Sequence, residues 1–132
     1  MANISRPLSF MFPGITFWPG GDCDIDGQTN SVSVWRRQEP QPTLAELAAA
    51  ELPAAKAATI AANRAECSRR IYARYPPGRQ LSALAGLYDL ANVAAMHEWI
   101  ALNIAAENTA ADAIEAATTV QAVEAVSVSW PA

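Results

Sequence analysis

The chain has 132 residues, which suits one domain, and 52% of them are hydrophobic, although many are alanines that each add little buried area. Its large apolar side chains must therefore be pooled in one core or complemented by a second copy. The formal net charge of -4 argues against a nucleic-acid partner, and because no run approaches the roughly 18 apolar residues of a membrane span, we expect a soluble protein without a membrane partner.

The first 42 residues are rich in proline and glycine turn signals and are predicted to form an extended docking arm. Apolar residues alternate at 15–18 and at 32–35, which favours a small hairpin or two short strands. Between them, Asp26 and Gly27 can adopt the positive φ angles of a tight hairpin turn. The prolines of "EPQP" then hold the chain extended up to the first helix.

A helix is predicted to begin at Thr43. Thr43 and Glu46 form a capping box, in which the hydroxyl and the carboxylate each satisfy a backbone N–H of the first turn. Pro53 falls inside the helical pattern. We expect it to kink the helix, or to split a short helix over 43–51 from a longer one that ends near Tyr75.

A second long helix is predicted from about Gln80 to Glu107, after the stop made by Pro-Pro-Gly. Its apolar residues fall on two neighbouring stripes, so its apolar face is wide and must be buried by a hairpin partner or by other subunits. The stripes comprise Leu81, Leu84, Tyr88, Ala95, Trp99 and Leu102, and Leu87, Leu90, Val93, Ile100 and Ile104. Two short helices, 109–116 and 118–126, and an extended "SVSWPA" segment are expected to follow.

Charge is segregated along the helical part of the sequence. Lysine and arginine cluster between residues 56 and 79, whereas the chain after residue 80 holds acidic residues and no lysine or arginine. An antiparallel hairpin with oppositely charged arms is the simplest account. Because an exposed ion pair contributes only ~0–1 kcal/mol, such pairs would select register and partner more than they stabilise the fold. The alternative is that the basic cluster binds a phosphate or an acidic lipid.

One acidic motif is similar to the opening of a calcium loop. Asp22, Asp24, Asp26 and Gly27 spell D-x-D-x-D-G, but Ser33 stands at the twelfth position, where the loop needs a bidentate glutamate. No helix precedes the motif. We therefore expect an acidic hairpin turn and no metal site.

Other chemistry-bearing residues are sparse. His97 is the single histidine, and Ala101 stands where a zinc-protease motif would place its second ligand, so a core or interface histidine is favoured. Cys23 and Cys67 are far apart in the sequence and are expected to be free thiols. The sequence contains neither a glycine-rich phosphate loop nor a nucleophile elbow, which predicts a protein without enzymatic activity and without cofactors.

Large aromatic and aliphatic residues are the candidates for contacts with other chains. Trp99 is expected in a core, whereas Trp35 and Trp130 fit a core and a contact with another chain equally well. The predicted interaction residues are Trp18, Trp35, Leu87, Leu90, Trp99, Ile100, Ile104 and Trp130.

Two stretches resemble segments of bacteriophage tail and tail-fibre-associated proteins. "VWRRQEPQPTLAELAAAE" resembles a tryptophan-containing strand followed by a Pro-Thr-x-x-Glu-Leu helix start, and "AIEAATTVQAVEAVSVSWP" resembles a common C-terminal ending of that group. Together they cover about a quarter of the chain. The resemblance implies a connector in the virion tail, present in the host cytoplasm during assembly, whose partners are other phage tail or fibre proteins and copies of itself.

We thus expect a mainly α protein: a helical hairpin or small bundle over residues 43–132, and an extended N-terminal arm over 1–42 with a short β-hairpin. The expected function is that of a structural tail component acting through protein–protein contacts and self-association. Two alternatives remain. One is a tail-fibre assembly chaperone that is absent from the virion, and the other is a small anion-binding regulatory helical domain.

Overall fold

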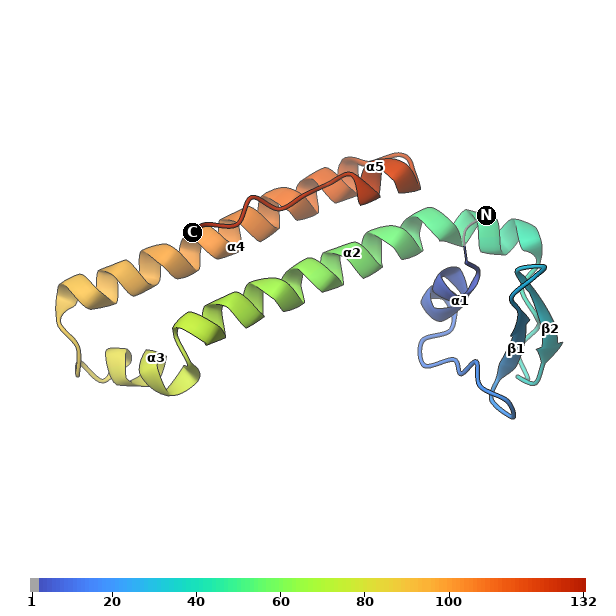
Figure 1. Ribbon diagram of the computed structural model, residues 1–132, viewed down its shortest axis with the longest axis horizontal. Helices are drawn as coiled ribbons and strands as arrows, with labels where there is room; N and C mark the ends of the chain where they lie inside the picture. Colours follow the sequence, from blue (N-terminus) through green and yellow to red (C-terminus); the bar gives the residue numbers. More distant parts are fainter. Residues whose placement is uncertain (1–2) are drawn as a thin grey trace. The chain divides into compact units, whose positions relative to one another are not determined.

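The structure is a computed structural model that describes residues 3–132, and it confirms a mainly α fold with a short N-terminal β-hairpin (Figure 1). The chain forms two compact units, one extending to Ala57 and the other comprising Ala58–Ala132. The sequence-based division lies at residue 42 instead. The elements in chain order are α1 (Ser5–Met11), β1 (Cys23–Asp26), β2 (Ser31–Trp35), α2 (Leu44–Arg74), α3 (Pro77–Leu84), α4 (Leu90–Ala116) and α5 (Val120–Glu124).

The N-terminal unit is built around a small apolar core to which α1 contributes. The helix α1 is a difference from the predicted extended arm, and Pro7 does not prevent it because a proline in the first helical turn removes an N–H that has no intrahelical partner. The buried core residues are Ile4, Leu8, Ile15, Cys23 and Leu47. Leu47 lies in the first turn of α2, so the start of that helix belongs to this core.

The predicted hairpin is confirmed, but its first strand and its turn lie elsewhere than expected. β1 and β2 pair antiparallel, and the first strand occupies Cys23–Asp26 rather than residues 15–18. The loop has four residues, and its positive φ falls on Asn30 (φ 50) rather than on Gly27. The Asp26 carboxylate accepts hydrogen bonds from the N–H groups of Gln28 and Thr29, which builds the turn from an aspartate side chain.

The start of α2 follows the predicted capping box. Thr43 Oγ1 accepts from the N–H of Glu46 at 3.1 Å, and the Glu46 carboxylate accepts from the N–H of Thr43 at 2.7 Å. Of the two outcomes expected at Pro53, a kink or a split, the split is wrong, since α2 runs unbroken from Leu44 to Arg74, close to the expected end at Tyr75. Pro53 is exposed, so its ring displaces no core packing, and the helix tolerates the missing backbone hydrogen bond.

The predicted helix from Gln80 to Glu107 is wrong, because the chain breaks it at Gly86. Gly86 has φ +77, and its N–H donates to the Ala83 carbonyl while that of Leu87 donates to the Ser82 carbonyl, which is the Schellman pattern of a helix end. Asp89 then caps α4 by accepting from Asn92 N–H at 2.8 Å. Two helices with a sharp corner therefore replace one long helix.

Replacing Gly86 with alanine is expected to lower the stability of the C-terminal unit by about 1–2 kcal/mol, because an L side chain is strained at this positive φ. No atom lies within 4 Å of the added Cβ, so the loss reports on backbone strain alone. Gly78→Ala is the matched control, because Gly78 lies in α3 without a positive φ and should become slightly more stable. Urea denaturation measures both, and equal effects would contradict the prediction.

The end of the chain differs from prediction mainly in its helix boundaries. The predicted short helix over 109–116 is the last part of α4, and α5 is shorter than the predicted 118–126. Thr119 caps α5 by accepting from Ala122 N–H at 3.0 Å. The last residues form neither helix nor strand, as expected for "SVSWPA".

Within the C-terminal unit, α2 and α4 run antiparallel (Figure 1). Three contacts fix the register and pair Arg64 with Glu107 (3.6 Å between Nε and Oε1), Arg70 with Asn103 (3.1 Å between Nε and Oδ1) and Tyr75 with Trp99 (5.7 Å between ring centroids). The segregated charges thus meet across the hairpin at Arg64 and Glu107, whereas Arg69 pairs with Glu66 on its own helix.

Candidate functional site

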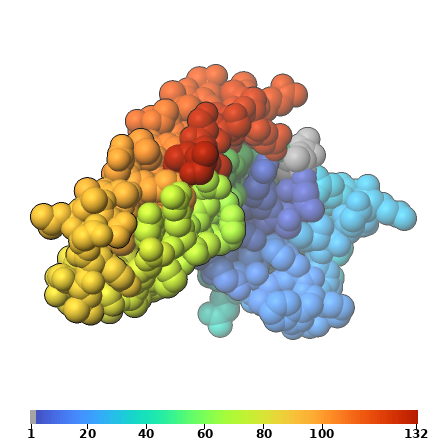
Figure 2. Space-filling view, turned by 60° about the vertical axis from the view of Figure 1, so that its left-hand side comes forward, coloured from blue at the N-terminus to red at the C-terminus, as the bar shows by residue number. Residues whose placement is uncertain are grey.

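Four leucines at the corner between α3 and α4 are exposed. We call Leu81, Leu84, Leu87 and Leu90 the leucine corner, and their side chains are between 65% and 87% exposed. Figure 2 shows this segment, in yellow, at the surface with no other part of the chain in front of it. Scattered leucines on a surface are ordinary, but four within ten residues form the kind of apolar patch that marks a contact site.

The predicted interaction residues Leu87 and Leu90 belong to this corner, and sequence reasoning left Leu81 and Leu84 out of the contact set. In one continuous helix, Leu81 and Leu84 would share one stripe and Leu87 and Leu90 the other, whereas the chain that is broken at Gly86 leaves all four exposed. Ile104, another predicted residue, is also exposed on α4. Part of the apolar surface of the segment after α2 is therefore not covered by any other part of this chain.

Trp99 and Ile100 lie instead against a small internal cluster. Both are half-buried and pack on the buried residues Tyr75, Ala83 and Met96. The Trp99 ring meets Tyr75 edge-on, which agrees with the expectation of a core tryptophan. These two residues hold α3 and α4 together.

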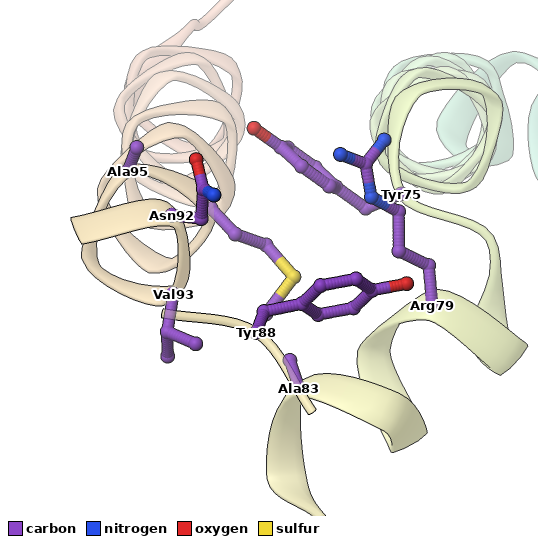
Figure 3. Close-up of a pocket in the computed structure, with 8 residues that line it drawn as sticks. Tyr75, Arg79, Ala83, Tyr88, Asn92, Val93 and Ala95 are labelled. Atoms are coloured by element: carbon purple, nitrogen blue, oxygen red, sulfur yellow. The ribbon is translucent and has the colours of Figure 1, made fainter. Parts of the chain in front are cut away.

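A small cavity opens beside this cluster, and Figure 3 shows the side chains that converge on it. The Arg79 guanidinium lies over two rings, 5.3 Å from the Tyr75 centroid and 5.9 Å from that of Tyr88. The volume is about 70 Å³, which accommodates a few waters but no cofactor. Arg79 therefore serves to join the end of α2 to the start of α4 through aromatic contacts.

Trp130 is bound within its own chain. The Arg70 guanidinium lies over the Trp130 ring at 5.4 Å from its centroid, and Arg70 also donates to the Pro131 carbonyl. Trp99 Nε1 donates to the Ala132 carbonyl at 3.0 Å. Trp99 thus contacts the segment that carries Trp130, which the sequence did not predict.

Trp18 and Trp35 belong to the N-terminal unit and differ in environment. Trp35 is half-buried, meets Phe12 edge-on at 5.3 Å and donates from Nε1 to the Glu39 carbonyl at 2.7 Å. Trp18 is 64% exposed. Trp35 therefore acts in the core of its unit, and Trp18 remains a candidate contact residue.

The acidic motif forms internal bonds. Asp22 accepts from Thr16 N–H and Oγ1, and Asp24 forms a two-bond ion pair with Arg36, with distances of 2.9 and 2.7 Å. The hydrogen bonds from Arg36 lower the pKa of the Asp24 carboxyl, and two backbone N–H groups lower that of Asp26. Over residues 3–132, His, Cys, Asp and Glu side chains form no cluster of three that could hold a metal ion.

The two thiols are buried and free, and the histidine is exposed. Burial raises the pKa of Cys23, as do the neighbouring Asp22 and Asp24 carboxylates, which keeps this thiol protonated and unreactive at neutral pH. Burial and Glu107 likewise raise the pKa of Cys67. Of the two positions expected for His97, the core position is wrong, because its side chain is open to solvent; the interface position stays a prediction.

Comparison with known protein families, with curated proteins and with solved structures finds no match to this chain. Within the part of the chain that the structure describes, no helix is long and apolar enough to cross a membrane.

Proposed function

We propose that this protein is a structural connector of a bacteriophage tail, associated with the tail fibre or baseplate, that acts through contacts with other tail proteins and with its own copies. The assignment to phage tails rests on the resemblance of residues 34–51 and 113–131 to such proteins. The observation that supports a contact function is the leucine corner. The proposal includes no catalysis and no cofactor.

The size of the corner indicates what kind of contact it makes. Burying four leucine side chains would contribute on the order of 5–10 kcal/mol. Association costs an estimated ~4–15 kcal/mol in lost freedom of the partners. The corner alone is therefore too small for a permanent assembly, and the exposed Leu102 and Ile104 on α4 are available to extend the contact.

Replacing Leu84, Leu87 and Leu90 together by glutamine is expected to weaken self-association at least tenfold, because it removes most of the apolar area of the corner. Leu44→Gln is the control, since Leu44 is comparably exposed but lies outside the corner. Sedimentation velocity over a range of concentrations measures the dissociation constant. A wild-type chain that stays monomeric at all concentrations, and that binds no other tail protein, would refute the proposal.

The assembly-chaperone alternative places the same contacts in a protein that leaves the finished particle. Mass spectrometry of purified virions separates the two, because a connector is retained in constant copy number and a chaperone is absent.

The anion-binding alternative rests on an open hollow of about 320 Å³ lined by Arg69, Arg70, Ala73, Arg74 and Trp99. Its arginines have partners already, since Arg69 pairs with Glu66 and Arg70 contacts the end of the chain. Titration with phosphate or a nucleotide tests it. A saturable change in tryptophan fluorescence would favour it, and no change would dismiss it.

A further inference from the structure

We propose that the groove that Arg70 and Arg74 of α2 form with Trp99 of α4 is a docking site for the segment Val126–Ala132, and that two copies of this chain can exchange these segments. The inference deepens the proposed self-association by naming a second contact. It is independent of the leucine corner, because the contacts that hold the segment are made by Arg70 and Trp99 and by none of the four corner leucines.

The docking contacts lie within the last three residues of the segment. Arg70 holds both the Trp130 ring and the Pro131 carbonyl, and Trp99 Nε1 holds the Ala132 carbonyl at 3.0 Å. Two of these contacts are hydrogen bonds to backbone carbonyls, and the third is a cation–π contact of the Arg70 guanidinium with the Trp130 ring. The groove therefore recognises a Trp-Pro peptide through one side chain and the backbone that follows it.

The receptor side of the groove is held in place by its own helices. Asn103 is fully buried, accepts from Arg70 Nε at 3.1 Å and donates to the Trp99 carbonyl at 2.9 Å. The Arg74 guanidinium lies over the Trp99 ring at 4.7 Å from its centroid. Because these bonds are made among α2 and α4 residues, the groove keeps its shape when the segment leaves, which lowers the cost of binding another one.

The rest of the segment is loosely packed. A hollow of about 220 Å³ lies between it and α4, lined mainly by small side chains: Ala106, Thr109, Ala110, Ala113, Val126, Ser127 and Ser129. Side chains that face this partly open hollow lack packing partners on that side, so this stretch adds less to the binding of the segment than its last three residues do.

The segment can also reach a neighbour. Fully buried Val123 anchors α5 in its own chain. The seven residues after Ala125 span up to about 23 Å when extended. A second copy offers the segment the same contacts as its own chain does. The fraction of exchanged segments therefore depends on protein concentration and on how far the segment can reach.

A fluorescein-labelled, amidated peptide with the sequence of residues 125–132 tests the inference by fluorescence polarisation with the full chain. The amide ensures that the peptide offers only carbonyls and the ring to the groove. Wild-type chain is expected to bind it weakly, because its own segment competes. Trp130→Ala in the full chain weakens that competitor and is expected to tighten peptide binding at least tenfold.

Two variants test which contacts are used. Arg70→Ala is expected to lose peptide binding, and Arg69→Ala is the matched control, since Arg69 is on the same helix but pairs with Glu66. Should Arg70→Ala disturb the fold by circular dichroism, a peptide in which alanine replaces the tryptophan decides the matter, because it should fail to bind the Trp130→Ala chain. Binding that ignores the tryptophan, or no binding to the Trp130→Ala chain, would overturn the inference.

The leucine-corner variant distinguishes this inference from the proposed function. It should still bind the peptide with unchanged affinity while its self-association is weakened. If the peptide fails to bind but the corner variant alters assembly, segment exchange is wrong and the connector proposal stands.

Discussion

Leu8→Ala is expected to lower the free energy of unfolding of the N-terminal unit by about 2–5 kcal/mol. Leu8 is fully buried in the core that joins α1 to the β-hairpin and to the first turn of α2. The loss combines the lost transfer free energy of the side chain with the cavity that remains. Because this core is small, few neighbours can close that cavity, which favours the upper part of the range.

Hydrogen exchange measured by mass spectrometry can assign this effect to the N-terminal unit. Peptides from residues 3–57 should exchange faster in Leu8→Ala, whereas peptides from 58–132 should be unchanged. Leu44→Ala serves as the control, because Leu44 is 66% exposed and should change stability by less than about 1 kcal/mol. A loss of equal size in both variants would show that the described core does not stabilise the unit.

Pro53→Ala is expected to raise the stability of α2 by up to about 3 kcal/mol. Proline in a helix interior removes one backbone hydrogen bond and crowds the preceding turn, and α2 runs through this position without a break. The side chain is exposed, so alanine forfeits no core contact. Thermal or urea denaturation measures the gain.

Pro40→Ala is the control for this substitution. Pro40 is exposed in the extended stretch before α2. A proline there interrupts no helix and reduces the conformational entropy of the unfolded chain. Its replacement should lower stability by about 0.4–1 kcal/mol. The two substitutions thus have opposite expected signs. A destabilising Pro53→Ala would mean that the proline fits a local distortion that α2 needs.

Local signals in the sequence predicted the ends of elements better than their continuity. Thr43 and Glu46 form the expected capping box because the motif involves only neighbouring residues. The corner at Gly86 and Asp89 was missed although both are ordinary helix-end residues, since apolar periodicity on both sides favoured one helix. The weight given to periodicity, rather than a lack of signal, explains this error.

The contact residues were predictable only in part, for a related reason. Leu87 and Leu90 were expected to be on a contact surface, and the structure leaves them exposed. The role of Arg70 and Asn103 was not predicted, because they lie 33 residues apart and meet only when α2 and α4 fold back on each other. No local pattern encodes such a pair. The charge segregation was the one available signal, and it pointed to the hairpin without naming its contacts.

The distribution of charge has a practical consequence for studying the hairpin. Trypsin cleaves after lysine and arginine. It can therefore cut within α2 and just after its end, but it leaves α4, α5 and the following segment in one piece, because no lysine or arginine occurs after Arg79. A molecule cleaved within α2 would keep its acidic fragment only through noncovalent contacts, such as the Arg64–Glu107 ion pair and the Arg70–Asn103 hydrogen bond. The rate at which that fragment dissociates on a size-exclusion column would therefore measure how strongly α2 and α4 bind each other.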